Sequence, residues 1–228
     1  MLKKIAARLP ESWQYELKRI HHRRQIKKGV FLTSEPEYKI LQDFIKPGDW
    51  VVDIGANIGY YTKRFSELVG PQGRVISFEP IPATFSLLAA NVQLFHNKNV
   101  TLINAAVSEK LDLAGMSIPS FSTGLKNYYE AHISTTKNRE LSILMFSLDS
   151  IFDTKNISLI KIDTEGHEEF VLAGMNNLLK KHLPILIIET HSKKIIKYLS
   201  SLGYLAERLS KSPNIIFKPN YFTRSLNS

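Results

Sequence analysis

Short apolar segments alternate with longer amphipathic segments over residues 46–217. The short segments predict buried strands, because continuous runs of Val, Ile and Leu are typical of strands that are covered on both faces. The longer segments have apolar positions at helical spacing. The predicted strands span residues 50–54, 74–79, 100–104, 159–163, 184–189 and 214–217, and the predicted helices span residues 60–69, 83–94, 167–181 and 193–202.

This alternation predicts βαβ units, whose right-handed crossovers build a parallel sheet with helices on both faces. Residues 105–146 interrupt the alternation. Within them, residues 111–118 and 141–146 are predicted to be short extended segments, and the polar stretch 120–140 lies between the two. We therefore predict an α/β fold, a doubly wound and mostly parallel sheet, in a chain whose 228 residues suit one large domain with an appendage.

The appendage is predicted at residues 1–34, a basic N-terminal helical arm, with the main domain at residues 35–228. Residues 1–28 contain nine Lys or Arg and two Glu, a net charge of +7 out of +9 for the chain. Pro10 is expected to divide the arm into two helices. The apolar residues of the arm recur at helical spacing: Ile5, Leu9, Trp13, Leu17 and Ile20.

This apolar stripe has two interpretations. The favoured one is that the stripe packs on the domain while the charges stay in water. The alternative is contact with an anionic membrane or an acidic partner surface. Nucleic acid is disfavoured as a partner, because the domain adds no second basic stripe.

The chain contains no cysteine. This excludes disulfides, thiolate nucleophiles, cysteine-ligated zinc and cysteine-held iron–sulfur clusters. No apolar run near the start reaches the ~7–15 residues of a secretory signal, and none approaches the ~20 residues of a membrane span. A cytoplasmic location is therefore predicted, at the membrane periphery if the arm binds lipid.

A glycine turn follows the first predicted strand. Asp53 ends the strand, and Gly55 and Gly59 bound the turn into the next helix. The turn lacks the third glycine of the sequence that seats a pyrophosphate. Glu79 ends the second strand 24 residues after Gly55, close to the ~20-residue offset at which a carboxylate binds ribose hydroxyls. A glycine turn with a ribose carboxylate is shared by proteins that bind NAD and proteins that bind S-adenosylmethionine, and the Asp53-x-Gly55 start with the missing third glycine favours S-adenosylmethionine. A capping Asp53 and a surface Glu79 form the alternative.

Ionisable side chains also gather after the fourth main strand. Four of them occur within six residues: Asp163, Glu165, His167 and Glu168. The carboxyl edge of a doubly wound sheet is where ligands bind, so these groups suit a proton acceptor or a hard divalent cation. Capping of the following helix is the alternative. Glu189 and His191, after the next strand, are predicted to face the same cleft.

Together, these motifs resemble the FkbM family of S-adenosylmethionine-dependent methyltransferases. The matching blocks are residues 52–62, 78–80, 104–108 and 161–168, and Glu189-Thr-His191 is similar to the closing strand of the family. The resemblance covers about residues 35–218. It implies a class I methyltransferase with a Rossmann-like fold that methylates a hydroxyl on a sugar, a glycan or glycolipid, or another natural-product scaffold.

The resemblance also implies a cofactor site. Its predicted residues are Asp53, Gly55, Ala56, Asn57, Gly59 and Tyr60 on the methionine side, Glu79 at the ribose, and Asn104 and Ala105 at the adenine. On the catalytic side, His167 is predicted to be the base, Asp163 to orient the base or the acceptor hydroxyl, and Glu165 to lie beside them. A Mg²⁺ ion held by Asp163 and its neighbours is the alternative to a metal-free base.

The acceptor is expected to contact residues 120–140, where the aromatic residues Phe121, Tyr128 and Tyr129 lie near His132. These aromatic residues could equally pin the loop to the core. The sequence also leaves three alternatives to an O-methyltransferase. An RNA methyltransferase is disfavoured because Asp163-Thr-Glu-Gly replaces the Pro-containing loop of base methylation. A non-catalytic binding module and a nicotinamide-dependent oxidoreductase are disfavoured by the intact acidic positions and by the glycine spacing.

Overall fold

The computed structural model describes residues 9–121, 126, 128, 131–134, 141–152 and 155–220. Its main sheet has seven strands in the order β10-β11-β9-β8-β1-β2-β3. The first five along the chain, β1 to β3, β8 and β9, pair in parallel, and β11 runs antiparallel to both of its neighbours, β9 and β10. The strands are β1 (Trp50–Ile54), β2 (Arg74–Phe78), β3 (Val100–Ile103), β8 (Ile157–Ile162), β9 (Ile185–Glu189), β10 (Tyr204–Glu207) and β11 (Asn214–Pro219).

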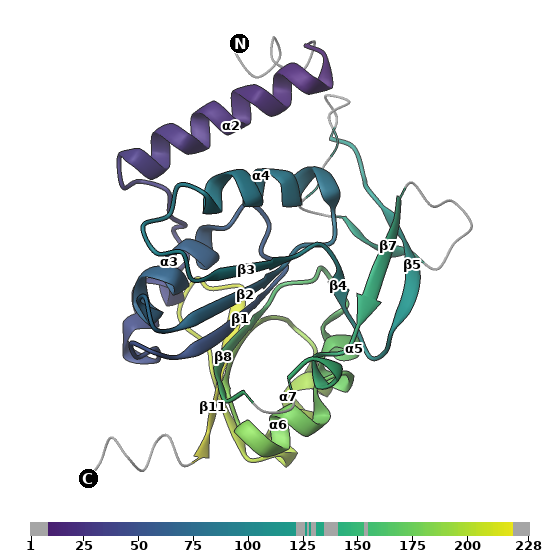
Figure 1. Ribbon diagram of the computed structural model, residues 1–228. Helices are drawn as coiled ribbons and strands as arrows, with labels where there is room; N and C mark the ends of the chain where they lie inside the picture. Colours follow the sequence, from purple (N-terminus) through teal and green to yellow (C-terminus); the bar gives the residue numbers. More distant parts are fainter. Residues whose placement is uncertain are drawn as a thin grey trace.

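Successive residues of the central strands face opposite layers, as the two-residue period of a strand requires. On one face, Val52 and Ile54 pack against α5 (Glu168–Ala173), α6 (Asn176–His182) and α7 (Lys193–Ser201). On the other face, Val51 packs against α3 (Tyr60–Val69) and two short 3₁₀ helices, η1 (Pro36–Lys39) and η2 (Leu41–Asp43). The prediction of a doubly wound α/β fold is confirmed, and Figure 1 shows the layers.

A second sheet is inserted between β3 and β8. It consists of β4 (Ala106–Val107), β5 (Asp112–Ser117), β6 (His132–Ser134) and β7 (Leu141–Phe146), in the order β4-β7-β5-β6. The two extended segments expected here therefore pair with each other, as β5 and β7, in antiparallel register. Met116, Ile143 and Met145 form a small separate core beneath this sheet, together with Ile81.

Two predictions of elements need correction. The helix expected over residues 167–181 is divided at Gly174 into α5 and α6. At Gly174 the backbone passes close to Ser108, in the segment after β4: a Cβ there would lie 1.9 Å from the backbone oxygen of Ser108, so the close approach requires glycine. In addition, β10 was not expected; it forms a hairpin with β11 at the edge of the sheet.

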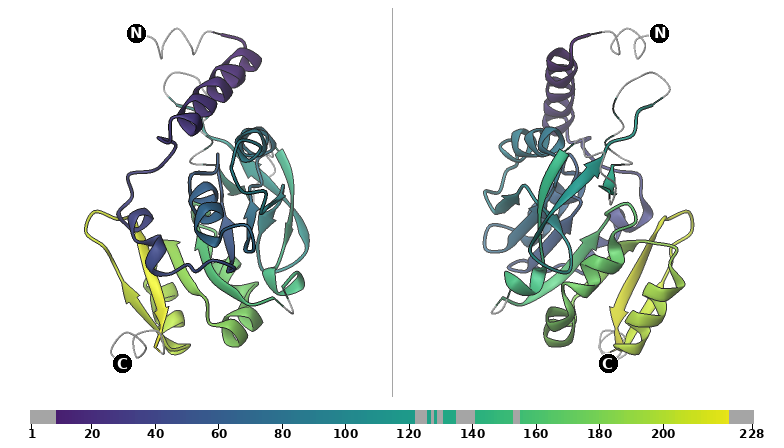
Figure 2. Two further views of the ribbon diagram at one scale, coloured as in Figure 1. Left: turned by 60° about the vertical axis from the view of Figure 1, so that its left-hand side comes forward. Right: turned by 90° about the vertical axis from the view of Figure 1, so that its right-hand side faces the viewer.

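The N-terminal arm forms helix α2 (Glu11–Lys27), which packs on α4 (Pro82–Val92). The contact is made by Tyr15 and Ile26, which join Phe31 and Leu87 in a small apolar cluster, and by buried His22. Figures 1 and 2 show α4 between α2 and the main sheet. Pro10 directly precedes the helix, and residues 1–8, with the first predicted helix and Ile5, lie outside the described residues.

The favoured interpretation of the arm's apolar stripe is wrong. Trp13, Leu17 and Ile20 are 65%, 48% and 45% exposed, so they do not pack on the domain. The contact with α4 uses the opposite side of the helix, because Tyr15 lies two residues, or about 200°, from Trp13. Helical periodicity does not reveal this second stripe, formed by Tyr15, His22 and Ile26, because His22 at its centre counts as a polar residue in a sequence pattern. Among the described residues, no helix has both the length and the apolar character needed to cross a bilayer.

Candidate active site

A cavity of about 390 Å³ opens at the carboxyl ends of β1, β2, β8 and β9. It lies where the strand order reverses, because β1 has β2 on one side and β8 on the other. Ligands bind at such switch points in doubly wound sheets. The second sheet forms an opposing wall of the cavity with Met116, His132 and Ile133.

The turn from β1 to α3 is shaped by contacts within the protein. Gly55 has φ +76°, and a Cβ there would lie 1.8 Å from the backbone oxygen of Asp163. Gly59 has φ +97°, and a Cβ there would lie 2.7 Å from Leu88 Cδ1. Both glycines therefore permit close packing inside the protein.

Asp53 lines the cavity and is almost fully buried. Its Oδ2 accepts a 2.6 Å hydrogen bond from Thr62 Oγ1, and its Oδ1 is a buried oxygen for which the described residues provide no hydrogen-bond partner. Burial raises the pKa of Asp53 to about 6, and the nearby Lys161 ammonium opposes this rise. A buried carboxylate oxygen of this kind can receive a cationic donor.

Glu79 is 4% exposed, so its interpretation as a surface charge is wrong. Its Oε2 accepts a hydrogen bond from Asn57 N at 3.0 Å, and its Oε1 accepts one from Ile81 N at 2.9 Å. Burial raises the pKa of Glu79 to about 7, against these two hydrogen bonds. Each oxygen keeps a second lone pair, so the carboxylate can still accept hydrogen bonds from a diol in the cavity.

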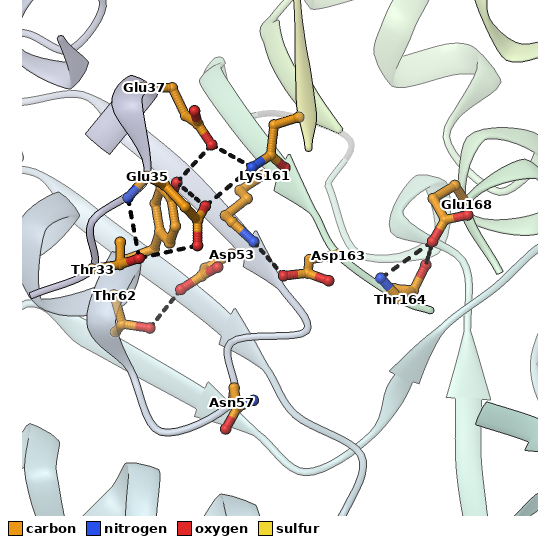
Figure 3. Close-up of polar contacts among 12 residues, drawn as sticks. Thr33, Glu35, Glu37, Asp53, Asn57, Thr62, Lys161, Asp163, Thr164 and Glu168 are labelled. Atoms are coloured by element: carbon orange, nitrogen blue, oxygen red, sulfur yellow. Dashed lines mark hydrogen bonds and ion pairs between the residues drawn. The ribbon is translucent and has the colours of Figure 1, made fainter. Parts of the chain in front are cut away.

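Lys161 lies near the carboxyl end of β8 and lines the cavity, and Figure 3 shows its side chain pointing toward Asp163. It is 3% exposed; its Nζ donates to Asp163 Oδ2 at 2.8 Å and lies 4.6 Å from the centre of the Tyr61 ring. Burial alone would lower the pKa of Lys161, but the carboxylates of Asp163 and Asp53 hold it above its ordinary value. The buried ammonium of Lys161 therefore balances the negative charges of Asp53 from β1 and of Asp163 at the end of β8.

The carboxylates around Lys161 also affect Glu189, which lines the cavity at the end of β9. Its pKa is raised to about 7 by burial and by the negative charges of Asp163 and Glu165. Glu189 is therefore partly protonated near neutral pH, when it can either donate or accept a hydrogen bond. Such a group suits contact with a hydroxyl.

His167 lies at the start of α5 and lines the cavity. Its Nε2 lies 2.9 Å from Ser108 Oγ, and its ring stacks on Phe170 at 4.6 Å. Burial lowers the pKa of His167, so the ring is neutral at pH 7. When Nε2 carries the hydrogen and donates it to Ser108, Nδ1 is available to accept a proton.

The model of the Methyltransferase FkbM domain family matches residues 53–206, which run from the end of β1 through β9. The chain belongs to the FkbM methyltransferase family. The fold of this family member is that of class I, Rossmann-like methyltransferases, as predicted. A crystal structure of methyltransferase FkbM from Methylobacillus flagellatus KT superposes with a TM-score of 0.55 at 16% identity, over 79% of this chain and 50% of that one.

Two curated relatives have similar sequences. Hexuronic acid methyltransferase AglP of Haloferax volcanii is 27% identical over 71% of this chain and 66% of its own length. The 31-O-demethyl-FK506 methyltransferase FkbM of Streptomyces tacrolimicus is 29% identical over 64% of this chain and 67% of its own length. The chain therefore spans about two thirds of the length of these relatives.

In this family member, the structure brings most of the predicted site residues to one cavity. The predicted residues that line it are Asp53, Gly55, Ala56, Asn57, Tyr60, Glu79, Ala105, Asp163, Glu165 and His167. Gly59 and Asn104 are not among the lining residues. The Asn104 amide instead donates to the backbone oxygens of Glu79 and Pro80, at 2.8 and 3.1 Å, and so holds the loop after β2.

The structure brings some of the remaining predicted residues to the cavity and places others elsewhere. Tyr128 and His132 line the cavity, whereas Phe121 is 46% exposed and Tyr129 lies outside the described residues. Glu189 faces the cavity, but His191 lies in a separate hollow beside α5. Glu168 closes its own loop, because its Oε1 accepts hydrogen bonds from Thr164 N, Thr164 Oγ1 and Gly166 N.

Sequence reasoning missed Lys161 and Glu35. Lys161 had a signal, a lone cation inside an apolar strand, which requires buried acidic partners. Glu35 had none, since it lies far from the motifs in sequence. It lines the cavity and accepts hydrogen bonds from Tyr61 OH at 2.6 Å and from Asn214 Nδ2 at 3.0 Å (Figure 3).

The part of the chain that the structure describes contains no evident set of ligands for a divalent cation. There, no three His, Asp or Glu side chains come together in a group suited to hold a metal ion. Asp163, the residue named for a Mg²⁺ site, is paired with Lys161.

Proposed function

We propose that this chain transfers the methyl group of S-adenosylmethionine to a hydroxyl oxygen of a sugar, glycan or other natural-product scaffold. The observation that carries the proposal is one cavity that joins two buried carboxyls, Asp53 and Glu79, to proton-accepting groups at the ends of β8 and β9. Membership of a methyltransferase family supports it.

The donor side of the cavity fits S-adenosylmethionine. The buried Oδ1 of Asp53 would receive the cationic amino end, and the Glu79 carboxylate, fixed by Asn57 N and Ile81 N, would hold the ribose hydroxyls. The neighbouring Ala105 would pack against the adenine, as the family resemblance implies. Bound S-adenosylmethionine supplies a methyl group on a sulfonium sulfur, which is a good leaving group.

On the acceptor side, His167 would accept the hydroxyl proton at Nδ1, because its lowered pKa keeps it neutral and Ser108 holds its Nε2. Asp163, fixed by Lys161, would orient the acceptor hydroxyl. Glu165 and Glu189 would complete the binding of neighbouring hydroxyls. The protein would then act mainly by alignment, which can supply roughly 7–11 kcal/mol of a barrier.

The acceptor class is inferred from the two curated relatives. Their names specify a hexuronic acid and the 31-oxygen of FK506 as what those two proteins methylate. In this chain, Tyr128 and His132 line the cavity, where their rings would contact the acceptor.

The first test is transfer of labelled methyl from S-adenosylmethionine to a fractionated extract of cells that encode the protein. Asp53→Asn, checked for folding by circular dichroism, is the control. Label in saccharide, lipid or small-molecule fractions, absent with the control, is the expected result. Label in RNA, or failure of the folded wild-type protein to bind S-adenosylhomocysteine, would overturn the proposal in favour of an RNA methyltransferase or a non-catalytic module.

A second test separates a histidine base from a metal. Turnover should survive exhaustive chelation and fall about a hundredfold or more in His167→Gln. Loss of turnover on chelation that Mg²⁺ restores would instead assign the activation of the hydroxyl to a metal ion at Asp163.

A further inference from the structure

The outer side of α2 carries an apolar stripe that the fold leaves uncovered. Trp13, Leu17 and Ile20 recur at intervals of four and three residues, so they lie on one side of the helix. All three are more than 40% exposed. Val30 and Leu32, just beyond the helix, are each 53% exposed as well. A large exposed apolar surface on a folded protein marks a site of interaction.

This stripe lies within a basic surface. Arg24 and Lys27 continue it by one and two further turns, and Arg23 flanks it; all three side chains are exposed. Within the helix, the exposed Glu16 is paired with Arg19 at 3.2 Å. Residues 11–28 contain six Lys or Arg and two Glu, so this helix is more basic than the domain behind it.

The opposite side of α2 fixes the direction in which this stripe faces. Tyr15 and Ile26 pack in the cluster with α4, and His22 is buried beside Phe31 with ring centres 5.8 Å apart. Figure 2 shows α2 at the outer limit of the molecule, with its long side free of other elements. The stripe is therefore held outward by a packed helix and can meet a flat surface along its length.

We propose that this face of α2, formed by Trp13, Leu17, Ile20, Arg24 and Lys27, docks the protein on an anionic lipid bilayer. A helix with aromatic and aliphatic residues beside basic ones lies in the interface of a bilayer, with its apolar side among the acyl chains and its cations at the headgroups. Charge complementarity decides the partner: a neutral surface would use the apolar residues alone and leave the cations unpaired.

Docking of this kind would bring the bilayer close to the second sheet. Lys18 Nζ lies 5.8 Å from the centre of the Tyr128 ring, and Tyr128 lines the cavity. The proposal itself rests on the arm and not on the proposed chemistry, so it can be tested by lipid binding alone.

The experiment is co-sedimentation of the full chain with vesicles of phosphatidylcholine, with and without phosphatidylglycerol. The protein should sediment with the vesicles that contain phosphatidylglycerol and stay in the supernatant with the vesicles of phosphatidylcholine alone. Trp13→Ser/Leu17→Ser/Ile20→Ser should weaken binding at least tenfold, and Arg23→Gln/Arg24→Gln/Lys27→Gln should do so by about a hundredfold at low salt. Both variants should keep the melting temperature within a few degrees of wild type.

Two matched variants serve as controls. Leu111→Ser/Leu113→Ser/Leu144→Ser removes comparable exposed apolar residues from the second sheet, and Lys180→Gln/Lys193→Gln/Lys197→Gln removes three exposed cations from α6 and α7. Neither should change vesicle binding by more than about twofold. In a Trp50→Phe background, where Trp13 is the remaining tryptophan, the fluorescence should shift to the blue on anionic vesicles.

Three results would overturn the proposal. The first is no binding to anionic vesicles, and the second is binding that the two arm variants leave unchanged. The third is binding to a short RNA that both arm variants abolish, with no vesicle binding, which would assign the surface to nucleic acid.

Discussion

The two halves of the cavity are built in different ways. The proposed donor half comes from Asp53, Asn57 and Glu79, which lie on or just after the consecutive strands β1 and β2, and both oxygens of Glu79 are held by backbone N–H groups. The proposed acceptor half gathers His167, Glu189 and the second sheet from distant parts of the chain. The donor half is thus organised by local backbone geometry, and the acceptor half depends on tertiary packing and charge balance.

Lys161 joins the two halves, because its ammonium lies between the carboxylates of Asp53 and Asp163. The largest expected effect therefore comes from Lys161→Met, which leaves the buried Asp53 and the partly buried Asp163 without a cation. We expect a loss of about 3 kcal/mol in the free energy of unfolding, measured with urea. Lys161→Met/Asp163→Asn should recover part of this loss.

The matched control for this change is Lys155→Met. Lys155 is exposed and lies 5.1 Å from the centre of the Trp50 ring, so its removal should cost less than about 1 kcal/mol. If Lys161→Met costs no more than this control, the two halves are not coupled through the lysine.

The same division explains what the sequence could predict. The strands β1 and β2 and the positions of Asp53 and Glu79 follow from local patterns, and the structure brings both residues to the cavity. The pairing of β5 with β7, the position of Glu35 and the break at Gly174 depend on contacts between distant segments. No local pattern contains that information.

The arm illustrates the limit for a helix with two apolar sides. Its sequence shows one clear stripe, through Trp13, and the structure packs the other, through Tyr15 and His22. The choice between them depends on the shape of α4, which periodicity does not describe. Lys161, by contrast, was available to sequence reasoning, since a cation in an apolar strand is a signal in its own right.

The second prediction tests the acceptor half. His167→Gln should lower turnover about a hundredfold and leave the affinity for S-adenosylhomocysteine unchanged within about threefold, because the residue acts on the hydroxyl proton. Turnover and isothermal titration calorimetry measure the two effects. Ser108→Ala, which removes the partner of Nε2, should lower turnover less, by about tenfold, through loss of orientation. A parallel loss of affinity in His167→Gln would contradict the division into two halves.

The third prediction tests the donor half. Glu79→Gln turns one acceptor oxygen into an amide that faces a backbone N–H group, at Asn57 or Ile81. We expect the affinity for S-adenosylhomocysteine to fall about thirtyfold, since a hydrogen bond to a charged group contributes about 1.5–3 kcal/mol. Glu189→Gln is the control, because it lies on the acceptor side and should keep this affinity. Equal losses in the two variants would show that one electrostatic unit, and not two halves, binds the donor.

The smallest effect concerns pH. Burial raises the pKa of Asp53 to about 6 and that of Glu79 to about 7. Without ligand, the folded protein therefore holds more protons than the unfolded chain between about pH 4 and 7, and this part of its stability falls as the pH rises through that range. The cationic donor should have the opposite dependence, because it needs the ionised carboxylates: its affinity should rise roughly tenfold from about pH 6 to about pH 7.5. Calorimetric titrations at several pH values measure this slope, and Asp53→Asn should reduce it; a wild-type affinity that is independent of pH would mean that neither carboxyl changes its protonation when the donor binds.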